Sequence, residues 1–225
     1  GVRGGGLMDT AVALVSAYLR FNGYMTAHEQ PVLVGEGEPV QYRTATDIDV
    51  LAVRFPSSAV VVPHDAGSVK VADDLEVALD PALGVRPGCV DVLVAEVKEG
   101  KPRLNRTLRD PDVLYATLRR VDPGFANDRI ERSVRQLIAE GEATCRTGGG
   151  ERPWWRFRLL AFGTGAADPE GGPFEVVQLR HVAMFLLRCM SRHRKVWNDA
   201  RFSDPVLDLL HLFDKLELVN PAPEA

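Results

Sequence analysis

Four residues that could bind a cation or move a proton lie near the ends of two predicted strands. Asp47 and Asp49 are two residues apart in TDIDVLAVR, and Glu96 and Lys98 are two apart in DVLVAEVKEG. Because side chains alternate between the faces of a strand, each pair leaves its strand on one face. If the two strands are neighbours, Asp49 and Glu96 can approach one cation, with the backbone carbonyl of Val97 as a third oxygen.

A small set of hard oxygen ligands with room for water is what Mg²⁺ requires, and Mn²⁺ is the alternative ion. The metal would act as a Lewis acid and make a bound water more acidic. Lys98 beside it could orient or deprotonate the attacking water, or neutralise a pentacovalent phosphate, and burial would bring the pKa of this lysine closer to neutrality. The pattern predicts metal-assisted hydrolysis of a phosphodiester.

The elements that must position these residues alternate between helical and strand patterns. Helices are predicted within residues 9–24, 110–121, 126–143, 181–193 and 205–217, and strands within residues 25–34, 46–54, 91–100, 154–164 and 174–180. Residues 35–43 are predicted to form the turn between the first two strands, and residues 163–173 a hairpin loop between the last two. The third strand is apolar at nearly every position before Glu96, which is typical of a central strand buried on both faces. This order predicts an α/β sandwich built on a mixed sheet.

The 225 residues predict one domain over residues 8–225, with an insertion at about 55–88 and C-terminal helices at about 179–218. The glycine-rich residues 1–7 are expected to be a disordered or vector-derived tail. No run of about 18 apolar residues is present, and the first residues lack the layout of a signal peptide. The sequence therefore predicts a cytoplasmic protein with no membrane partner.

The charge along the chain changes sign at Lys98. Residues 1–97 contain six Lys and Arg against thirteen Asp and Glu, whereas residues 98–135 contain ten against six. The loop after the third strand carries four cations that are candidates for contacts with a phosphate backbone: Lys101, Arg103, Arg106 and Arg109. The alternative is a solvated surface loop whose basic residues make no contact with a nucleic acid.

Two further groups of residues have a structural and a functional interpretation. Trp154 and Trp155 stand beside Arg156 and Arg158, so they could stack on unpaired bases or contact the backbone, but the favoured interpretation is one ring in the core and its neighbour on the surface. The basic residues 191–195 are expected to complement the dipole of a helix end.

At this point the chain resembles a known group of nucleases. TDIDVLAVR followed by VLVAEVKEG is similar to the D…(D/E)xK signature of the PD-(D/E)xK, or restriction-endonuclease-like, superfamily, which includes Mrr-type restriction enzymes and archaeal Holliday-junction resolvases. AYLRFNGYMT resembles the first helix and strand of that core, and the similarity covers roughly residues 8–54 and 89–140. The resemblance implies an α/β/α sandwich around a central mixed β-sheet, in which Asp49 and Glu96 bind the metal and Lys98 serves catalysis.

The same resemblance suggests three secondary site residues. Asp47 matches an acidic residue that often precedes the metal ligand by two, and Gln136 matches a glutamine that often lies on the helix after the ExK strand. Many relatives carry a glutamate on the first helix, where this chain offers only Asp9 and, in the following strand, Glu29. The separation of Asp49 and Glu96 also exceeds that of compact relatives, so the chain must accommodate an insertion.

The sequence thus predicts a Mg²⁺-dependent (endo)deoxyribonuclease that hydrolyses DNA phosphodiester bonds in restriction, phage defence or DNA repair. A homodimer is expected, because one active site cuts one strand and symmetric pairs are the common oligomer. One alternative is a nuclease-like module that binds DNA or docks a protein without cleaving anything. Another is an unrelated α/β domain in which Asp47, Asp49 and Glu96 are solvent-facing strand ends.

Overall fold

The structure, a computed structural model, describes residues 9–38, 40–56, 79–121, 124–146, 153–166, 172–192 and 204–216. The predicted tail and most of the predicted insertion at about 55–88 lie outside these residues. The helices in the described ranges are α1 (Thr10–Phe21), α2 (Pro111–Val121), α3 (Asn127–Glu140), α4 (Leu179–Arg192) and α6 (Pro205–Lys215), with short 3₁₀ turns η3 (Pro81–Leu83) and η4 (Arg106–Arg109). The strands are β1 (Met25–Glu36), β2 (Gln41–Arg54), β3 (Cys89–Val97), β4 (Glu142–Arg146), β5 (Trp154–Gly163) and β6 (Glu175–Gln178).

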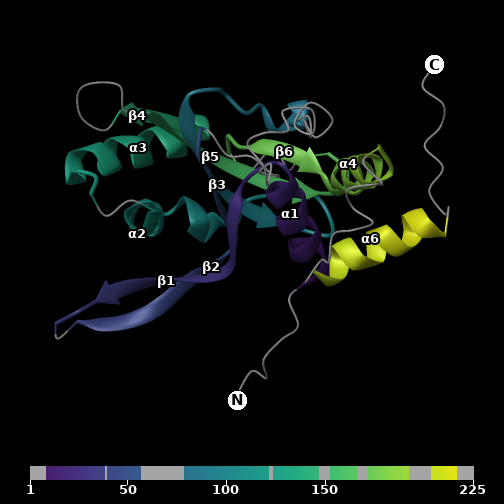
Figure 1. Cartoon of the computed structure of the whole chain (residues 1–225). Helices are drawn as coiled ribbons and strands as arrows, with labels where there is room; N and C mark the ends of the chain where they lie inside the picture. Colours follow the sequence, from purple (N-terminus) through teal and green to yellow (C-terminus); the bar gives the residue numbers. More distant parts are fainter. Residues whose placement is uncertain are drawn as a thin grey trace, which may run out of the picture.

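The six strands form one mixed sheet in the order β1-β2-β3-β5-β4, with β6 paired to β5 (Figure 1). β1, β2 and β3 are successively antiparallel, β3 and β5 are parallel, β4 is antiparallel to β5, and β6 is parallel to it. The predicted α/β class with a mixed sheet is confirmed.

Helices cover both faces of the sheet and enclose two apolar cores. One core joins α1, α4 and α6 to residues such as Val50, Leu93 and Phe162. The other joins α2, α3 and η4 to residues on the opposite face, such as Val92 and Phe157. All nine residues of β3 are buried, which confirms the prediction of a central strand covered on both faces.

The first helix forms where the sequence predicts it. Val12, Val15 and Leu19 are buried at helical spacing, and the Asp9 carboxylate caps the start by accepting a hydrogen bond from the backbone N–H of Ala11 at 2.8 Å. Gly23, with φ of 80°, lies just after the helix end, in a conformation that favours glycine. The helix packs against α4 and against the sheet.

The first hairpin is longer than the sequence predicts. Residues 35–43 were expected to be a turn, but β1 continues to Glu36 and β2 begins at Gln41, with Gly35 opposite Tyr42. A Cβ atom at Gly35 would lie 2.8 Å from Cγ1 of Val40, so this exposed side chain would have to shift. β3 pairs only with the Val50–Arg54 part of β2. The outer part of the hairpin therefore extends beyond the rest of the sheet as an arm (Figure 1).

Two predictions about the later strands were wrong. β5 and β6 were expected to form a hairpin, yet residues 160–163 and 175–178 pair in parallel. Gly and Pro mark a loop, but their presence does not say in which direction the next strand returns. The predicted helix over 126–143 ends at Glu140, where Gly141 takes a φ of 75° and the chain enters β4.

None of the helices in the described ranges is long and apolar enough to cross a membrane.

Candidate active site

The register of β2 and β3 brings the predicted site residues together. Val50 lies opposite Ala95 in this antiparallel pair. One step further along both strands, Asp49 lies opposite Glu96, so that their side chains share a face of the sheet. Lys98 follows directly after the end of β3 at Val97.

The lysine nitrogen lies between the two carboxylates. Lys98 Nζ is 2.5 Å from Glu96 Oε1 and 3.5 Å from Asp49 Oδ2. These two oxygens are therefore at most about 6 Å apart, which is within the range that a single cation and its oxygen ligands can span. The idea that Asp49 and Glu96 are separate strand ends, each facing solvent alone, does not fit this geometry.

The backbone of Val97 also faces this site. Its N–H donates a hydrogen bond of 2.8 Å to Asp49 Oδ2. The N–H and C=O of one strand residue point to the same neighbouring strand, so the Val97 carbonyl also faces the β2 side. A carbonyl oxygen in this position could add a third oxygen to the two carboxylates.

Glu96 is the most deeply buried member of the group, with 4% of its side chain exposed, against 25% for Asp49 and 33% for Lys98. Burial raises the pKa of Glu96, while the hydrogen bond from Lys98 acts in the opposite direction. Glu96 Oε2 is buried and makes no hydrogen bond of normal geometry to the described residues, although the backbone of Asn105 lies close enough to lower the pKa of this carboxyl. A buried carboxylate oxygen without such a bond is costly, and this one is placed to accept a ligand.

The pKa of Lys98 does not move in the expected direction. Burial, the largest single effect, lowers it, but the hydrogen bonds and negative charges of Glu96 and Asp49 together outweigh burial and raise the pKa. The prediction that burial would bring the pKa of Lys98 closer to neutrality was wrong. It took desolvation into account but not the two carboxylates beside the lysine. Lys98 is therefore a charged hydrogen-bond donor.

The chain after Lys98 is held against the end of β5. The backbone N–H of Lys98 donates to the carbonyl of Phe162 at 2.9 Å, and that of Thr164 donates to the carbonyl of Gly100 at 2.7 Å. Gly163 permits this approach, because a Cβ atom there would lie 2.7 Å from Gly100 O and from Pro102 N. These contacts fix the direction in which the chain leaves Lys98.

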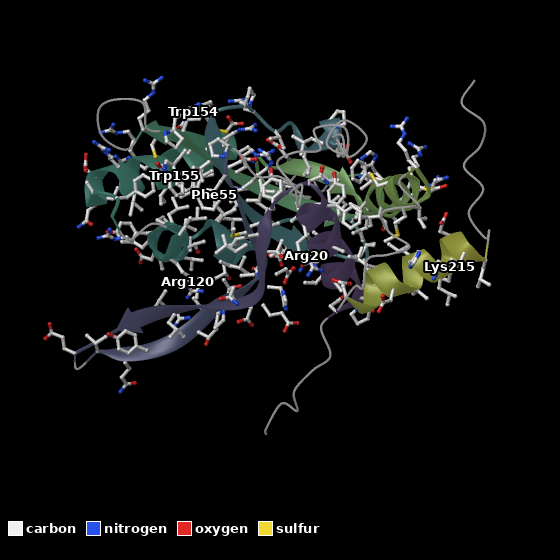
Figure 2. All side chains as sticks on the ribbon, viewed as in Figure 1. Arg20, Phe55, Arg120, Trp154, Trp155 and Lys215 are labelled. Atoms are coloured by element: carbon white, nitrogen blue, oxygen red, sulfur yellow. The ribbon has the colours of Figure 1, made fainter. Side chains whose placement is uncertain are left out.

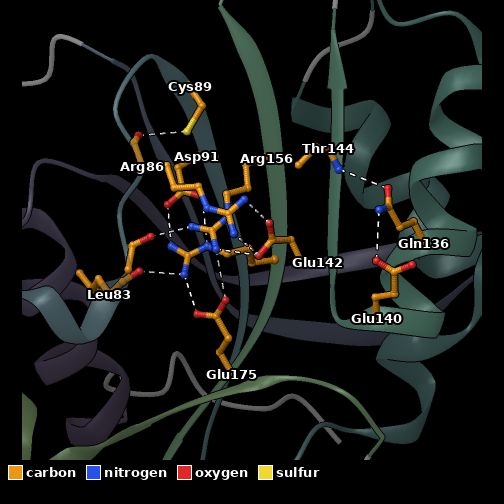
Figure 3. Close-up of polar contacts among 12 residues, drawn as sticks. Leu83, Arg86, Cys89, Asp91, Gln136, Glu140, Glu142, Thr144, Arg156 and Glu175 are labelled. Carbon is orange, nitrogen blue, oxygen red and sulfur yellow. Dashed lines mark hydrogen bonds and ion pairs between the residues drawn. The ribbon is translucent and has the colours of Figure 1, made fainter.

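The secondary candidates lie in different places. Asp47 is exposed on the arm, two residues before Asp49 and on the same face of β2. Glu29 is exposed on β1, between His28 and Gln30, which pair with Val50 and Ile48 on either side of Asp49. The φ of 50° at Glu29 is unusual for a residue other than glycine. The structure does not bring Gln136 to the site, because its amide binds Thr144 and Glu140 (Figure 3).

The four basic residues of the predicted phosphate-binding loop also differ from one another. Lys101, Arg103 and Arg106 are exposed. Arg109 donates a hydrogen bond of 2.7 Å to the carbonyl of Ile138 near the end of α3. Three of the four are thus on the surface, while Arg109 connects η4 to α3.

A buried ionic network lies at the other end of β3 (Figure 3), and the sequence did not single it out as a unit. Arg158, fully buried, donates to Asp91 Oδ2 and to Glu175 Oε2, both at 2.6 Å. Arg156 donates to Glu142 Oε2 at 2.7 Å. The available signal was one aspartate in the otherwise apolar start of β3. Because its charges are paired and because Arg158, Asp91 and Arg156 are buried, this network is structural.

Of the two tryptophans labelled in Figure 2, Trp155 packs in the core, which is the structural role that was favoured. Its ring lies 5.1 Å from the ring of Phe125 and 6.1 Å from that of Phe157, centroid to centroid. This packing belongs to the core between the sheet and α2 and α3.

No group of three or more His, Cys, Asp or Glu side chains in the described ranges is arranged to hold a metal ion. The site therefore offers two carboxylates and a backbone carbonyl. No protein-family profile, characterised protein or solved structure compared with this chain gives a match.

Proposed function

We propose that this protein is a Mg²⁺-dependent nuclease that hydrolyses phosphodiester bonds of DNA. The observation that carries the proposal is the pairing of Asp49 and Glu96 around one cationic group, with a buried oxygen of Glu96 left without a hydrogen bond of normal geometry. Two carboxylates from neighbouring strands, plus a carbonyl, suit an ion that keeps several waters and takes further oxygens from a phosphate substrate.

The proposed metal ligands are Asp49, Glu96 and the Val97 carbonyl. A bound Mg²⁺ or Mn²⁺ would polarise the phosphate and lower the pKa of a coordinated water. These residues fit such an ion by chemistry, because all three offer hard oxygen atoms and Glu96 Oε2 makes no hydrogen bond of normal geometry to the described residues.

Lys98 is proposed to act as a charged hydrogen-bond donor. Its ammonium is held beside both carboxylates and its pKa is raised, so it remains protonated at neutral pH. It is 33% exposed, so a phosphate at the site could also reach it. In this position it would neutralise charge on the phosphate and orient the attacking water, rather than remove a proton from it.

The exposed cations Lys101, Arg103 and Arg106 are proposed to contact the DNA backbone. They follow the site residues directly in the chain and belong to a basic stretch in a protein whose net charge is −4. Positive charge concentrated beside the carboxylates would compensate the repulsion between an acidic site and a polyanion.

The fold is proposed to be the restriction-endonuclease-like one. The succession of α1, an antiparallel β1-β2-β3, a helical segment and a strand parallel to β3 supports this, since Asp49 and Glu96 stand on the second and third strands.

One observation favours an alternative, a nuclease-like module that binds DNA or a protein without cleaving. Lys98 already pairs with both carboxylates. The described part of the chain supplies no third acidic ligand. Two carboxylates that pair with a lysine in this way could serve only to hold β2 and β3 together.

Divalent-ion titration separates the two functions. Mg²⁺ and Mn²⁺ binding is measured by calorimetry, and cleavage is measured on supercoiled plasmid and on branched DNA. Asp49→Asn and Glu96→Gln should each abolish both binding and cleavage, whereas Asp112→Asn, which removes an exposed acid from α2, should change neither. Metal binding without cleavage of any nucleic acid would favour the alternative. Cleavage by the Glu96→Gln protein at the original rate would disprove the assigned site.

A further inference from the structure

Helix α4 has one buried and one basic face. Val182, Leu186 and Met190 are buried towards the core shared with α1 and α6. Arg180, His181, Arg188 and Arg192 are exposed. The segment from Leu179 to Lys195 contains no Asp or Glu, although the whole chain carries a net charge of −4. The basic face is therefore a strong local exception to the charge of the protein.

A groove of about 450 Å³ lies on this face, a volume typical of small-molecule sites. The residues that line it come from the end of β6 and the first two and a half turns of α4: Gln178, Arg180, His181, Met184, Phe185 and Arg188. Spacings of three, four and seven residues place the helical ones on one side of α4. The groove thus combines guanidinium and imidazole groups with two apolar side chains.

His181 is held in place from the protein side. Its Nε2 lies 2.6 Å from Oδ2 of Asp80, a carboxylate with 3% exposure that also accepts a hydrogen bond of 2.7 Å from the Tyr18 hydroxyl. The imidazole itself is 44% exposed. A buried carboxylate on one ring nitrogen fixes the ring and leaves Nδ1 for another partner.

The charges of the groove select an anion. None of its lining residues is acidic. Among the described residues, Arg180 and Arg188 have no ion-pair or hydrogen-bond partner. Guanidinium groups match phosphate oxygens in both geometry and charge. Two arginines and an oriented histidine around one groove therefore suit a phosphate group, whose several oxygens can accept hydrogen bonds from all three, better than a neutral ligand.

The apolar part of the groove suits a flat ring. The Phe185 ring is anchored edge-on against Tyr18, with ring centroids 5.4 Å apart, and remains partly exposed beside Met184. Aromatic side chains provide stacking surfaces for nucleobases. The Gln178 side-chain nitrogen donates to the Gly165 carbonyl at 2.8 Å, which leaves its oxygen as an acceptor for an N–H group.

We propose that this groove on α4 binds a nucleoside phosphate, with the phosphate between Arg180, His181 and Arg188 and the base against Phe185. The ligand is either a free mononucleotide or the phosphorylated end of a nucleic-acid strand, which share this chemistry. The site is separate from Asp49, Glu96 and Lys98, so the inference does not depend on the proposed nuclease activity.

The test uses the full chain in excess EDTA, so that no metal-dependent binding or cleavage contributes. Calorimetry compares AMP with adenosine, and a 5′-phosphorylated six-nucleotide strand with its 5′-hydroxyl counterpart. AMP should bind at least about tenfold more tightly than adenosine, since charge-assisted bonds to phosphate are the strong ones. Arg180→Gln and Arg188→Gln should each weaken AMP binding by about tenfold or more. Arg192→Gln is the matched control, an exposed arginine of α4 outside the groove, and should change the affinity less than twofold.

A preference for the 5′-phosphorylated strand over AMP would identify a strand end as the ligand, and equal affinities would identify the mononucleotide. In both cases, binding must weaken in the Arg180→Gln and Arg188→Gln proteins. Absence of AMP and strand binding, equal binding of AMP and adenosine, or an Arg192→Gln loss as large as the other two would overturn the proposal. Far-ultraviolet circular dichroism of each variant excludes unfolding as the cause of any loss.

Discussion

The Oδ2 atom of Asp49 accepts a hydrogen bond from the backbone N–H of Val97 at 2.8 Å, so that a carboxylate of β2 is attached directly to the strand that carries Glu96. The same oxygen lies 3.5 Å from Lys98 Nζ. A side chain tied to backbone keeps its rotamer without a ligand, which is what a preorganised site requires.

Replacing Lys98 by methionine should separate metal binding from cleavage. The substitution removes the ammonium that competes for Asp49 and Glu96. We expect Mg²⁺ affinity at pH 8 to be unchanged or higher, while DNA cleavage falls by about 100-fold or more, because a charged donor to the phosphate is lost. Calorimetry and plasmid cleavage measure the two effects, with Lys215→Met, at an exposed position on α6, as a control for lost surface charge. Parallel losses of binding and cleavage would mean that Lys98 mainly holds the carboxylates in place.

Gly163→Ala should destabilise the protein and disturb the chain after Lys98. The new Cβ would lie 2.7 Å from backbone atoms of Gly100 and Pro102, which cannot move aside as the end of a long side chain can. Overpacking of this kind costs about 1–3 kcal/mol of unfolding free energy. Gly100→Ala is the matched control, because a Cβ there meets nothing within 4 Å. Urea unfolding of both variants measures the difference, and equal stabilities would contradict the close approach.

Asp91→Asn should be among the most destabilising single substitutions. It leaves the fully buried Arg158 without its carboxylate partner on β3. Breaking a buried ion pair by removing one partner costs roughly 3 kcal/mol or more. Asp128→Asn breaks a pair with Arg132 in which both side chains are at least 70% exposed, so its cost should stay below about 0.5 kcal/mol. Chemical denaturation compares the two, and similar small losses would argue against a structural role for the network.

Glu142→Gln should make stability less dependent on acid pH. The hydrogen bond from Arg156 lowers the pKa of Glu142 below its ordinary value of 4.5, so the unfolded state binds more protons than the folded state. This stabilisation is present above the ordinary pKa and is lost as pH falls through the folded-state value. The wild-type protein should therefore exceed the variant in unfolding free energy at pH 7, and the difference should shrink steadily below about pH 4.5. Urea titrations at pH 7, 5, 4 and 3 measure it, and a difference that grows towards low pH would refute the sign.

The basic loop should contain two functional kinds of arginine. Arg103→Gln and Arg106→Gln, at exposed positions, should each reduce the salt dependence of DNA binding by about one unit of slope without affecting stability. Arg109→Gln should instead lower stability, because Arg109 donates to the Ile138 carbonyl. Fluorescence anisotropy across salt concentrations, with Ca²⁺ replacing Mg²⁺ to prevent cleavage, tests both expectations. If Arg109→Gln reduced the salt dependence of DNA binding as much as the other two substitutions, Arg109 would also be a DNA contact.

Much of the fold was predictable because each element has a local pattern. The helical spacing of Val12, Val15 and Leu19 predicted α1, and the apolar run before Glu96 predicted a strand covered on both faces. β4 was not predictable, since EATCR follows a strong helical pattern and only the left-handed Gly141 stops the helix. The prediction that β5 and β6 pair in an antiparallel hairpin was wrong for a related reason. Strand direction depends on the route of the connection, which no periodicity records.

The sequence by itself determined the types and spacing of the site residues, and so the side of its strand that each would take. Only the tertiary structure decided which of them meet. The β2–β3 register places Asp49 opposite Glu96, whereas the packing of α3 on β4 commits Gln136 to Thr144. The electrostatic environment of Lys98 likewise required both strands, because its raised pKa depends on Asp49, 49 positions earlier in the chain. Local periodicity fixes the direction of a side chain, but its partners are set by register and packing between segments that are distant in sequence.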